Sequence, residues 1–215
     1  GPGISRIAAS VICIHGDDYG LILPFDMAPI QVVIVPVIFK GEEKPIMQKC
    51  EEIKRRLEGA GIRVKLDDRD LSAGSKFYYW ELMGTPFRLE IGPNEVRERN
   101  VTVFRRDKRT REIFEEKTLV DTIKRMAKDV ISFLRMKAED YITKNTREVA
   151  TKEEVLEASS EGGFVKMNFC GLKECADEMK GQAGGFEVRG TLFGSEQKPK
   201  GKCAWCGKKA TQVVY

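Results

Sequence analysis

Four cysteines near the end of the chain have the spacing of a metal site. Cys170 and Cys175 form a C-x4-C pair, and Cys203 and Cys206 form a C-x2-C pair. Two short pairs separated by a loop can surround a tetrahedral ion, because each pair supplies two thiolates. Zinc suits this ligand set, and four protein ligands leave no position for a water molecule. The pattern predicts a structural zinc, with two disulfides or free thiols as the alternative.

A second group of polar residues has the side chains for acid–base chemistry. His15, the single histidine, precedes Asp17 and Asp18 in IHGDDYG and could form a metal site or part of a Ser-His-Asp arrangement. We favour a helix C-terminus followed by an Asx turn. The segment DDRD at 67–70 contains an arginine, which indicates a salt-bridged loop. Because Walker and G-x-G-x-x-G motifs are also missing, the residues alone indicate no catalytic centre.

The composition is that of a charged globular protein, with 41% hydrophobic and 33% charged residues among 215 and a net charge of +4. Seven arginines and lysines fall within residues 97–111, a run that we interpret as a solvated hairpin. The sequence shows neither a membrane-spanning stretch nor a signal peptide, so we expect a cytoplasmic, reducing setting that favours metal binding over disulfides. Cys13 and Cys50 lie on apolar helical faces and are expected in the core. Gly1-Pro2 looks like the remnant of a protease site.

The hydrophobic pattern predicts the elements that position these residues. Residues 6–15 form a short apolar helix, and the β-branched run 31–39 forms a buried central strand. A helix, a strand, a helix continuing into a strand, a hairpin and a long helix follow at residues 44–61, 62–66, 76–91, 101–108 and 118–144. Strands alternating with helices predict a mixed α/β sandwich over about residues 28–125.

The chain changes character after Asn145. Thr151 and Glu154 form a capping box that opens a short helix, which ends at Gly162-Gly163. Residues 193–202 have the composition of an exposed loop. A segment of this size with so few aliphatic residues needs a covalent or metal crosslink to fold, and the four cysteines provide one.

Glu81 occupies an unusual position in the stretch KFYYWELMGTPFRLEIGP. It lies in the last turn of a predicted helix, where the negative end of the helix dipole disfavours a carboxylate. Arg88 follows seven residues later in the next predicted strand. A surface ion pair between the two would contribute at most about 1 kcal/mol. Such a local conflict is typical of functional sites.

The same stretch carries a resemblance to a known family. DDRD followed by G-x-KF-x-x-WE-x-x-G-x-PFR-x-EIGP closely resembles the anticodon-binding domain of archaeal and eukaryotic-type prolyl-tRNA synthetases. HGDDYGLILPFDMAPIQVVIVP is similar to the family's passage from catalytic core to anticodon domain. The four cysteines and Tyr215 resemble its C-terminal zinc domain. The resemblance spans the chain from Arg6 to Tyr215.

The resemblance implies roles for particular residues. The family's anticodon contacts fall on Glu81, Arg88 and Asn94, although the family usually has a basic residue at the last of these. Proline anticodons carry two guanines, whose N1 and N2 groups suit a carboxylate and whose O6 and N7 atoms suit an arginine. Arg6 corresponds to the ATP-binding arginine of class II motif 3, in a segment one residue shorter than usual. The four cysteines would hold the zinc.

The resemblance also implies an organisation and an activity. Residues 1–27 would end the class II catalytic core, 28–125 form a three-layer anticodon-binding domain, 126–147 form a connecting helix, and 148–215 form a small α+β zinc-binding domain. The intact enzyme would be a homodimer that attaches proline to tRNA(Pro) with ATP and magnesium. The chain itself, without motifs 1 and 2, is expected to be inactive. The alternatives are a non-catalytic tRNA-binding accessory protein and a purely structural zinc protein.

Overall fold

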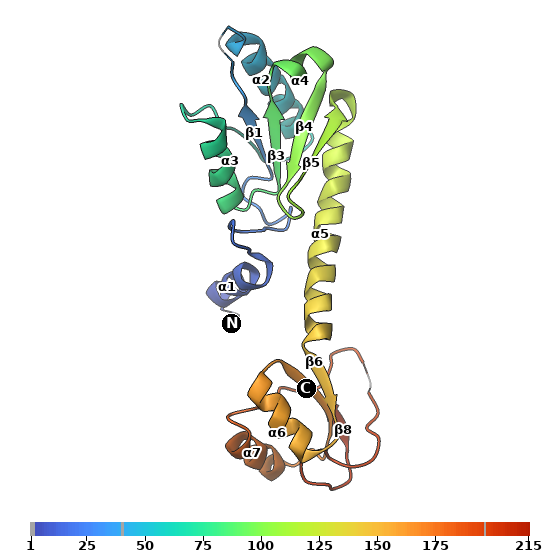
Figure 1. The fold of residues 1–215 in the computed structure, drawn as a ribbon. Helices are drawn as coiled ribbons and strands as arrows, with labels where there is room; N and C mark the ends of the chain where they lie inside the picture. Colours follow the sequence, from blue (N-terminus) through green and yellow to red (C-terminus); the bar gives the residue numbers. More distant parts are fainter. Residues whose placement is uncertain (1–2, 40, 196) are drawn as a thin grey trace. The chain divides into compact units, whose positions relative to one another are not determined.

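The computed structural model describes residues 3–39, 41–195 and 197–215 (Figure 1), so that Gly1-Pro2 lies outside the described residues. The chain divides into two compact units, which meet between Lys137 and Ala138. Each unit has its own sheet and its own hydrophobic core. No helix within the described ranges is long and apolar enough to cross a membrane.

The first unit is built on a five-stranded mixed sheet in the order β2-β1-β3-β4-β5. The strand β1 runs parallel to both β2 and β3, whereas β3, β4 and β5 are antiparallel. The strands are β1 Val32–Pro36, β2 Val64–Leu66, β3 Phe87–Ile91, β4 Asn100–Arg105 and β5 Thr110–Glu115. All of β1 is buried, as its unbroken β-branched run predicts. The predicted mixed α/β fold is thereby confirmed.

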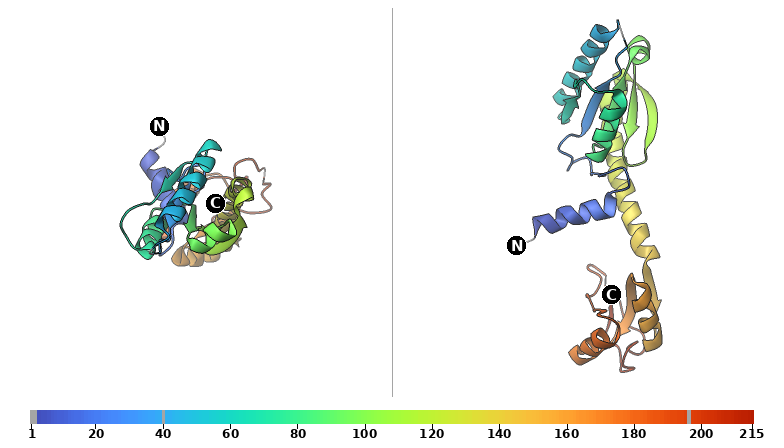
Figure 2. Two further views of the ribbon diagram at one scale, coloured as in Figure 1. Left: turned by 90° about the horizontal axis from the view of Figure 1, so that it is seen from above. Right: turned by 60° about the vertical axis from the view of Figure 1, so that its left-hand side comes forward.

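Helices cover both faces of this sheet (Figure 2). Because successive side chains of β1 point to opposite faces, each face of this strand has residues to pack against a helix. Val32 and Ile34 belong to the main core, which α2 and the first half of α5 complete. Val33 and Val35 pack instead against Trp80 of α3. The helices on this framework are α2 Glu43–Gly59, α3 Ala73–Leu82, α4 Pro93–Glu98, the 3-10 turn η1 Glu116–Thr118 and α5 Leu119–Lys144.

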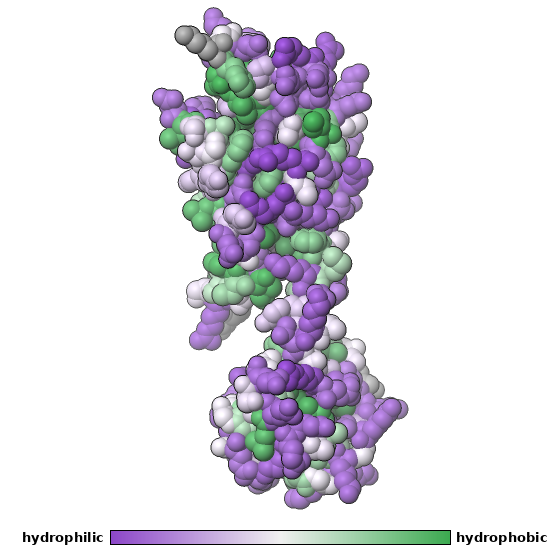
Figure 3. All heavy atoms as spheres, in the orientation of Figure 1, coloured by the Kyte–Doolittle hydropathy of each residue, from purple (hydrophilic) through white to green (hydrophobic). Residues whose placement is uncertain are grey.

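The first helix, α1 (Ile4–His15), is apolar yet contributes no buried residue. Ile4, Ile7, Ile12 and Ile14 are all at least half exposed, and green spheres lie over this helix in Figure 3. Cys13 is exposed as well, so the expectation that it is a core residue is wrong. Cys50, by contrast, is buried in α2, where burial raises its pKa to about 12.

The second unit contains a three-stranded sheet in the order β6-β7-β8, with β6 parallel and β8 antiparallel to β7. Its elements are β6 Thr146–Val149, α6 Lys152–Glu161, β7 Phe164–Phe169, α7 Lys173–Gln182 and β8 Gln212–Val214. The predicted capping box opens α6, with Glu154 N–H donating to the Thr151 hydroxyl. Val155, Met179 and Trp205 are among the buried residues of its core. The predicted exposed loop, residues 193–202, includes Glu196, which lies outside the described residues.

Candidate nucleic-acid interface and metal centre

Glu81 lies in the last turn of α3, facing β3 of the sheet. Its Oε1 atom accepts a hydrogen bond from Arg88 Nη1 at 3.0 Å. Its Oε2 atom is buried and has no hydrogen bond among the described residues, although Arg109 Nη2 is 3.3 Å away. The ion pair that the sequence suggested therefore exists, but it is buried rather than on the surface, because the Glu81 and Arg88 side chains are only 9% and 2% exposed.

Arg88 is held on every side by its neighbours. Its guanidinium lies between the rings of Phe77 and Phe104, 3.9 and 4.1 Å from their centroids. Nε and Nη2 donate to Glu90 Oε1 at 3.1 and 2.8 Å. With the bond to Glu81, three of the five N–H groups of Arg88 have partners. Arg88 thus fixes the positions of two carboxylates, and two of its N–H groups have no partner among the described residues.

The register of the sheet places a further arginine near Arg88. Arg88 on β3 lies opposite Phe104 on β4, which lies opposite Arg111 on β5. Arg111 is about half exposed and donates from Nε to Glu90 Oε1 at 3.1 Å. The face around Glu81 therefore combines a buried carboxylate, that of Glu81, and a partly buried one, that of Glu90, with partly exposed arginines. Such a set can accept from base N–H groups and also contact phosphates.

The structure separates Asn94 from the other two predicted anticodon residues. Asn94 is exposed in α4, at the opposite end of β3, and its Oδ1 accepts from Arg97 Nη2 at 2.6 Å. Within the described ranges no contact joins it to Glu81 or Arg88. Arg6 is exposed on α1, and its side chain forms no ion pair with any described residue.

Two arginines that sequence reasoning did not single out anchor Glu81. Arg106 is almost fully buried; its Nε donates to the Glu81 backbone carbonyl at 3.1 Å and its Nη1 donates to Asp17 at 2.8 Å. The Arg109 guanidinium lies 3.1 Å from the centroid of the Tyr19 ring. The predicted hairpin is present, but the expectation that its basic residues are solvated is wrong for Arg105 and Arg106.

The turn after α1 is built against the end of α3. Gly20 adopts φ +130°, and a Cβ there would lie 2.4 Å from Leu82 Cα, so only glycine allows this approach. Tyr19 N–H donates to Asp17 Oδ1 at 2.9 Å, which is the predicted Asx turn. The hydrogen bond from Arg106 lowers the pKa of Asp17, and burial lowers the pKa of His15. These groups form a structural turn rather than an acid–base pair.

The DDRD segment is the predicted salt-bridged loop. Arg69 donates to both oxygens of Asp67, at 2.8 and 2.7 Å, and Trp80 Nε1 donates to Oδ2 at 2.7 Å. Burial alone would raise the pKa of Asp67, but these hydrogen bonds outweigh it and lower the pKa to about 2. The loop thus fixes α3, and with it Glu81, on the sheet.

The four predicted metal-binding cysteines come together in the second unit. Cys170 follows β7, Cys175 lies in α7, and the other two lie in a short loop closed by a bridge between Lys202 and Lys209. Their sulfur atoms all lie within 4.8 Å of one another, with the pairs 175–203 and 206–170 at 3.9 and 3.6 Å. Four thiolates about 2.3 Å from a tetrahedral zinc would be about 3.8 Å apart. The donor set fits such an ion, and the distances are too long for the alternative of disulfides.

Comparisons with known proteins identify both units. Residues 31–126 match the family model of an anticodon binding domain, and residues 152–215 match the model described as prolyl-tRNA synthetase, C-terminal. Both units are therefore similar to parts of prolyl-tRNA synthetases. Proline–tRNA ligases of Thermofilum pendens, Methanopyrus kandleri and Pyrococcus horikoshii are 44%, 40% and 38% identical to it. These alignments cover 100%, 99% and 97% of the chain and 45%, 44% and 44% of the relatives. The chain thus spans less than half the length of these synthetases.

Proposed function

We propose that this chain is the anticodon-binding and zinc-binding part of a proline–tRNA ligase. The observation that carries the proposal is Glu81, a buried carboxylate with one oxygen lacking a hydrogen bond, in a unit that matches an anticodon-binding domain. Guanine presents the N1–H and N2–H donors that such an oxygen pair can accept. Bases of a single-stranded anticodon loop can be splayed out to reach it.

We assign different tasks to the residues of the site. Glu81 would accept from an anticodon guanine, while Arg88 holds the carboxylate in place and would offer its two remaining N–H groups to O6 or N7. Asn94, exposed at the other end of β3, would contact a different nucleotide. Arg6 would bind ATP once the catalytic core surrounds α1, whose apolar side chains are exposed here.

The four clustered cysteines would hold a structural zinc. Thiolates from β7, α7 and the loop after them would be crosslinked by the ion, which supplies no chemistry beyond this. The second unit would otherwise rest on a small core. The ion therefore serves folding rather than catalysis.

The activity of the intact protein belongs to the same proposal. A proline–tRNA ligase would activate proline with ATP and magnesium and transfer it to tRNA(Pro), as a cytoplasmic homodimer joined through its catalytic core. The domain limits that we propose are the predicted ones, 1–27, 28–125, 126–147 and 148–215. A non-catalytic tRNA-binding accessory protein built from the same two domains is the alternative.

A fluorescence-anisotropy titration tests the proposed anticodon recognition. The chain is titrated at two salt concentrations with tRNA(Pro) and with a variant whose two anticodon guanines are changed to cytosine. We expect several-fold weaker binding of the variant at both salts, since base contacts survive screening. Equal binding of the two RNAs, lost equally with salt, would leave only phosphate attraction and overturn the proposal.

A further inference from the structure

In the second unit, the basic residues that form ion pairs and those that form none among the described residues lie in different parts of the chain. All seven lysines and arginines between Lys144 and Arg189 form ion pairs with acidic side chains. Residues 197–215 contain five lysines and neither Asp nor Glu. None of these five has an ion pair among the described residues, and all five are exposed: Lys198, Lys200, Lys202, Lys208 and Lys209. The free positive charge of the unit is therefore concentrated in one short segment.

Backbone contacts hold this segment in place. The Asn168 side chain on β7 donates from Nδ2 to the Lys200 carbonyl at 3.0 Å and accepts from the Lys200 N–H at 3.1 Å. Lys202 and Lys209 face each other across the bridge that closes the cysteine loop, and Cys203 N–H donates to the Lys208 carbonyl at 2.7 Å. The lysines thus project from a fixed backbone, which reduces the ordering cost of binding.

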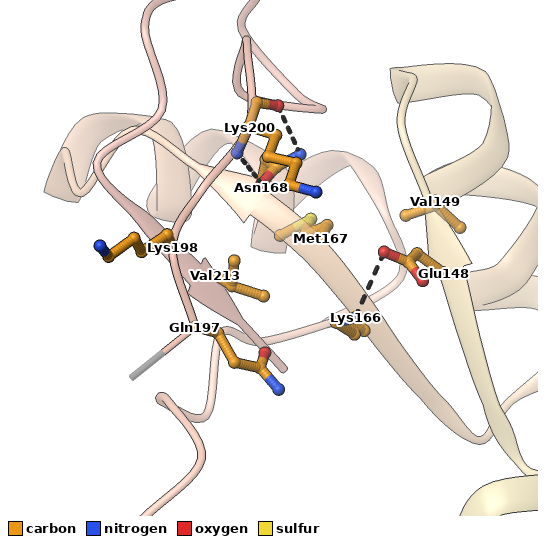
Figure 4. Close-up of a pocket in the computed structure, with 9 residues that line it drawn as sticks. All are labelled: Glu148, Val149, Lys166, Met167, Asn168, Gln197, Lys198, Lys200 and Val213. Carbon is orange, nitrogen blue, oxygen red and sulfur yellow. Dashed lines mark hydrogen bonds and ion pairs between the residues drawn. The ribbon is translucent and has the colours of Figure 1, made fainter. Parts of the chain in front are cut away.

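A pocket of about 290 Å³ opens beside the segment (Figure 4). Lys198 and Lys200 line it together with Lys166. Among the described residues of its lining, the single carboxylate is that of Glu148, which is paired with Lys166 at 3.3 Å, as the dashed line shows. An anion entering the pocket would therefore meet two lysines, Lys198 and Lys200, that form no ion pair with any carboxylate of the described residues.

We propose that these five lysines form a second RNA-binding surface, which contacts the phosphate backbone without reading sequence. Lysine ammonium groups bind phosphate as point charges. The segment from Gln197 onward contains no arginine, the side chain that forms bidentate hydrogen bonds with base edges. RNA is favoured over an acidic protein because the first unit of the same chain matches an anticodon-binding domain. The inference rests on the proposed function, because it takes the bound RNA to be a tRNA.

The test is the salt dependence of RNA binding by the full chain. In the variant Lys198→Gln/Lys200→Gln/Lys209→Gln, three phosphate contacts are removed, so the slope of log K against log salt should become shallower by about 2. Its affinity for tRNA(Pro) and for the cytosine anticodon variant should fall by the same factor. The matched control is Lys144→Gln/Lys173→Gln/Lys180→Gln, which removes three exposed lysines that already have acidic partners.

Bound zinc per chain and far-UV circular dichroism verify that both variants keep their fold. A slope that is unchanged in the first variant, or equally changed in the control, overturns the inference and leaves acidic proteins as the partner class of this surface. Failure of the proposed function would give a different result in the binding experiment. In that case the unsubstituted chain itself would not distinguish the guanine anticodon from the cytosine one.

Discussion

At the scale of the residue, the contacts of Glu81 explain why a carboxylate is tolerated at the negative end of a helix. Arg88 and Arg109 contact its two oxygens, and Arg106 binds its backbone carbonyl. These contacts with positively charged groups offset the unfavourable position of the carboxylate at the end of the helix. In the function that we propose, this carboxylate is the acceptor for a base that supplies donors.

Glu81→Gln keeps the size of the side chain and replaces one acceptor oxygen by a donor group. We expect the preference for the guanine anticodon over the cytosine one to fall by about 1–3 kcal/mol, the range for one bidentate base contact. Anisotropy titrations with both RNAs measure it. Glu112→Gln, at an exposed acid on β5, should leave the preference unchanged. If the preference survived in Glu81→Gln, another residue would read the guanine.

Asp67 gives a prediction about pH. Its pKa of about 2 in the folded chain lies below the unfolded value of about 3.9. The ionised carboxylate therefore stabilises the fold above about pH 4, and this contribution, about 2.5 kcal/mol, is lost as the pH falls from about 4 to 2. A carboxyl-carbon NMR titration measures the pKa directly. Arg69→Ala should raise it, and a pKa of Asp67 that stays low in this variant would contradict the role of that arginine.

At the scale of the element, sequence patterns predicted what depends on neighbours in the chain. The buried strand β1, the apolar stripe of α2 and the capping box of α6 follow from periodicity and local hydrogen bonding. The Arg106–Asp17 contact joins residues 89 positions apart, so no local pattern could reveal it. Cys13 was misplaced because its helix has an apolar face that no described residue buries.

The candidate site was predicted to a different extent in each unit. Cysteine spacing was sufficient to group the four thiols, since metal ligands must converge wherever the fold places them. The family resemblance pointed to Glu81 and Arg88 as anticodon contacts, which stays a prediction, but it did not indicate that Arg88 is enclosed by two aromatic rings. That enclosure depends on cross-strand register, which the sequence does not display.

Removing one ligand of the zinc that we propose should unfold the second unit alone. In Cys203→Ser the unit loses an ion whose binding contributes on the order of 10 kcal/mol in small zinc-dependent domains, so residues from about 150 onward should become protease-sensitive. The first unit should resist, because its core is separate. Limited proteolysis and zinc content measure this. Cys13→Ser, at a cysteine outside the cluster, is the control, and a fully folded Cys203→Ser would refute the structural zinc.

At the scale of the whole molecule, the chain spans about 45% of the length of the Thermofilum pendens relative and matches the models of an anticodon binding domain and of the C-terminal part of prolyl-tRNA synthetase. We therefore expect it to bind tRNA(Pro) and to form no prolyl-tRNA. An aminoacylation assay with radiolabelled proline, ATP and tRNA(Pro) measures this. A full-length relative serves as positive control. Clear turnover by the chain would show that it contains a complete active site.

The placement of the two tryptophans has an optical consequence. Trp80 is buried in the first unit, where its indole N–H donates to Asp67, and Trp205 is buried in the second unit with the Lys152 ammonium 4.3 Å from its ring centroid. The sequence contains no third tryptophan. Each unit thus holds a single tryptophan, and the two lie in different polar environments. Replacing either one by phenylalanine turns the remaining emission into a reporter of one unit, so that the folding of the two halves can be followed separately without labelling.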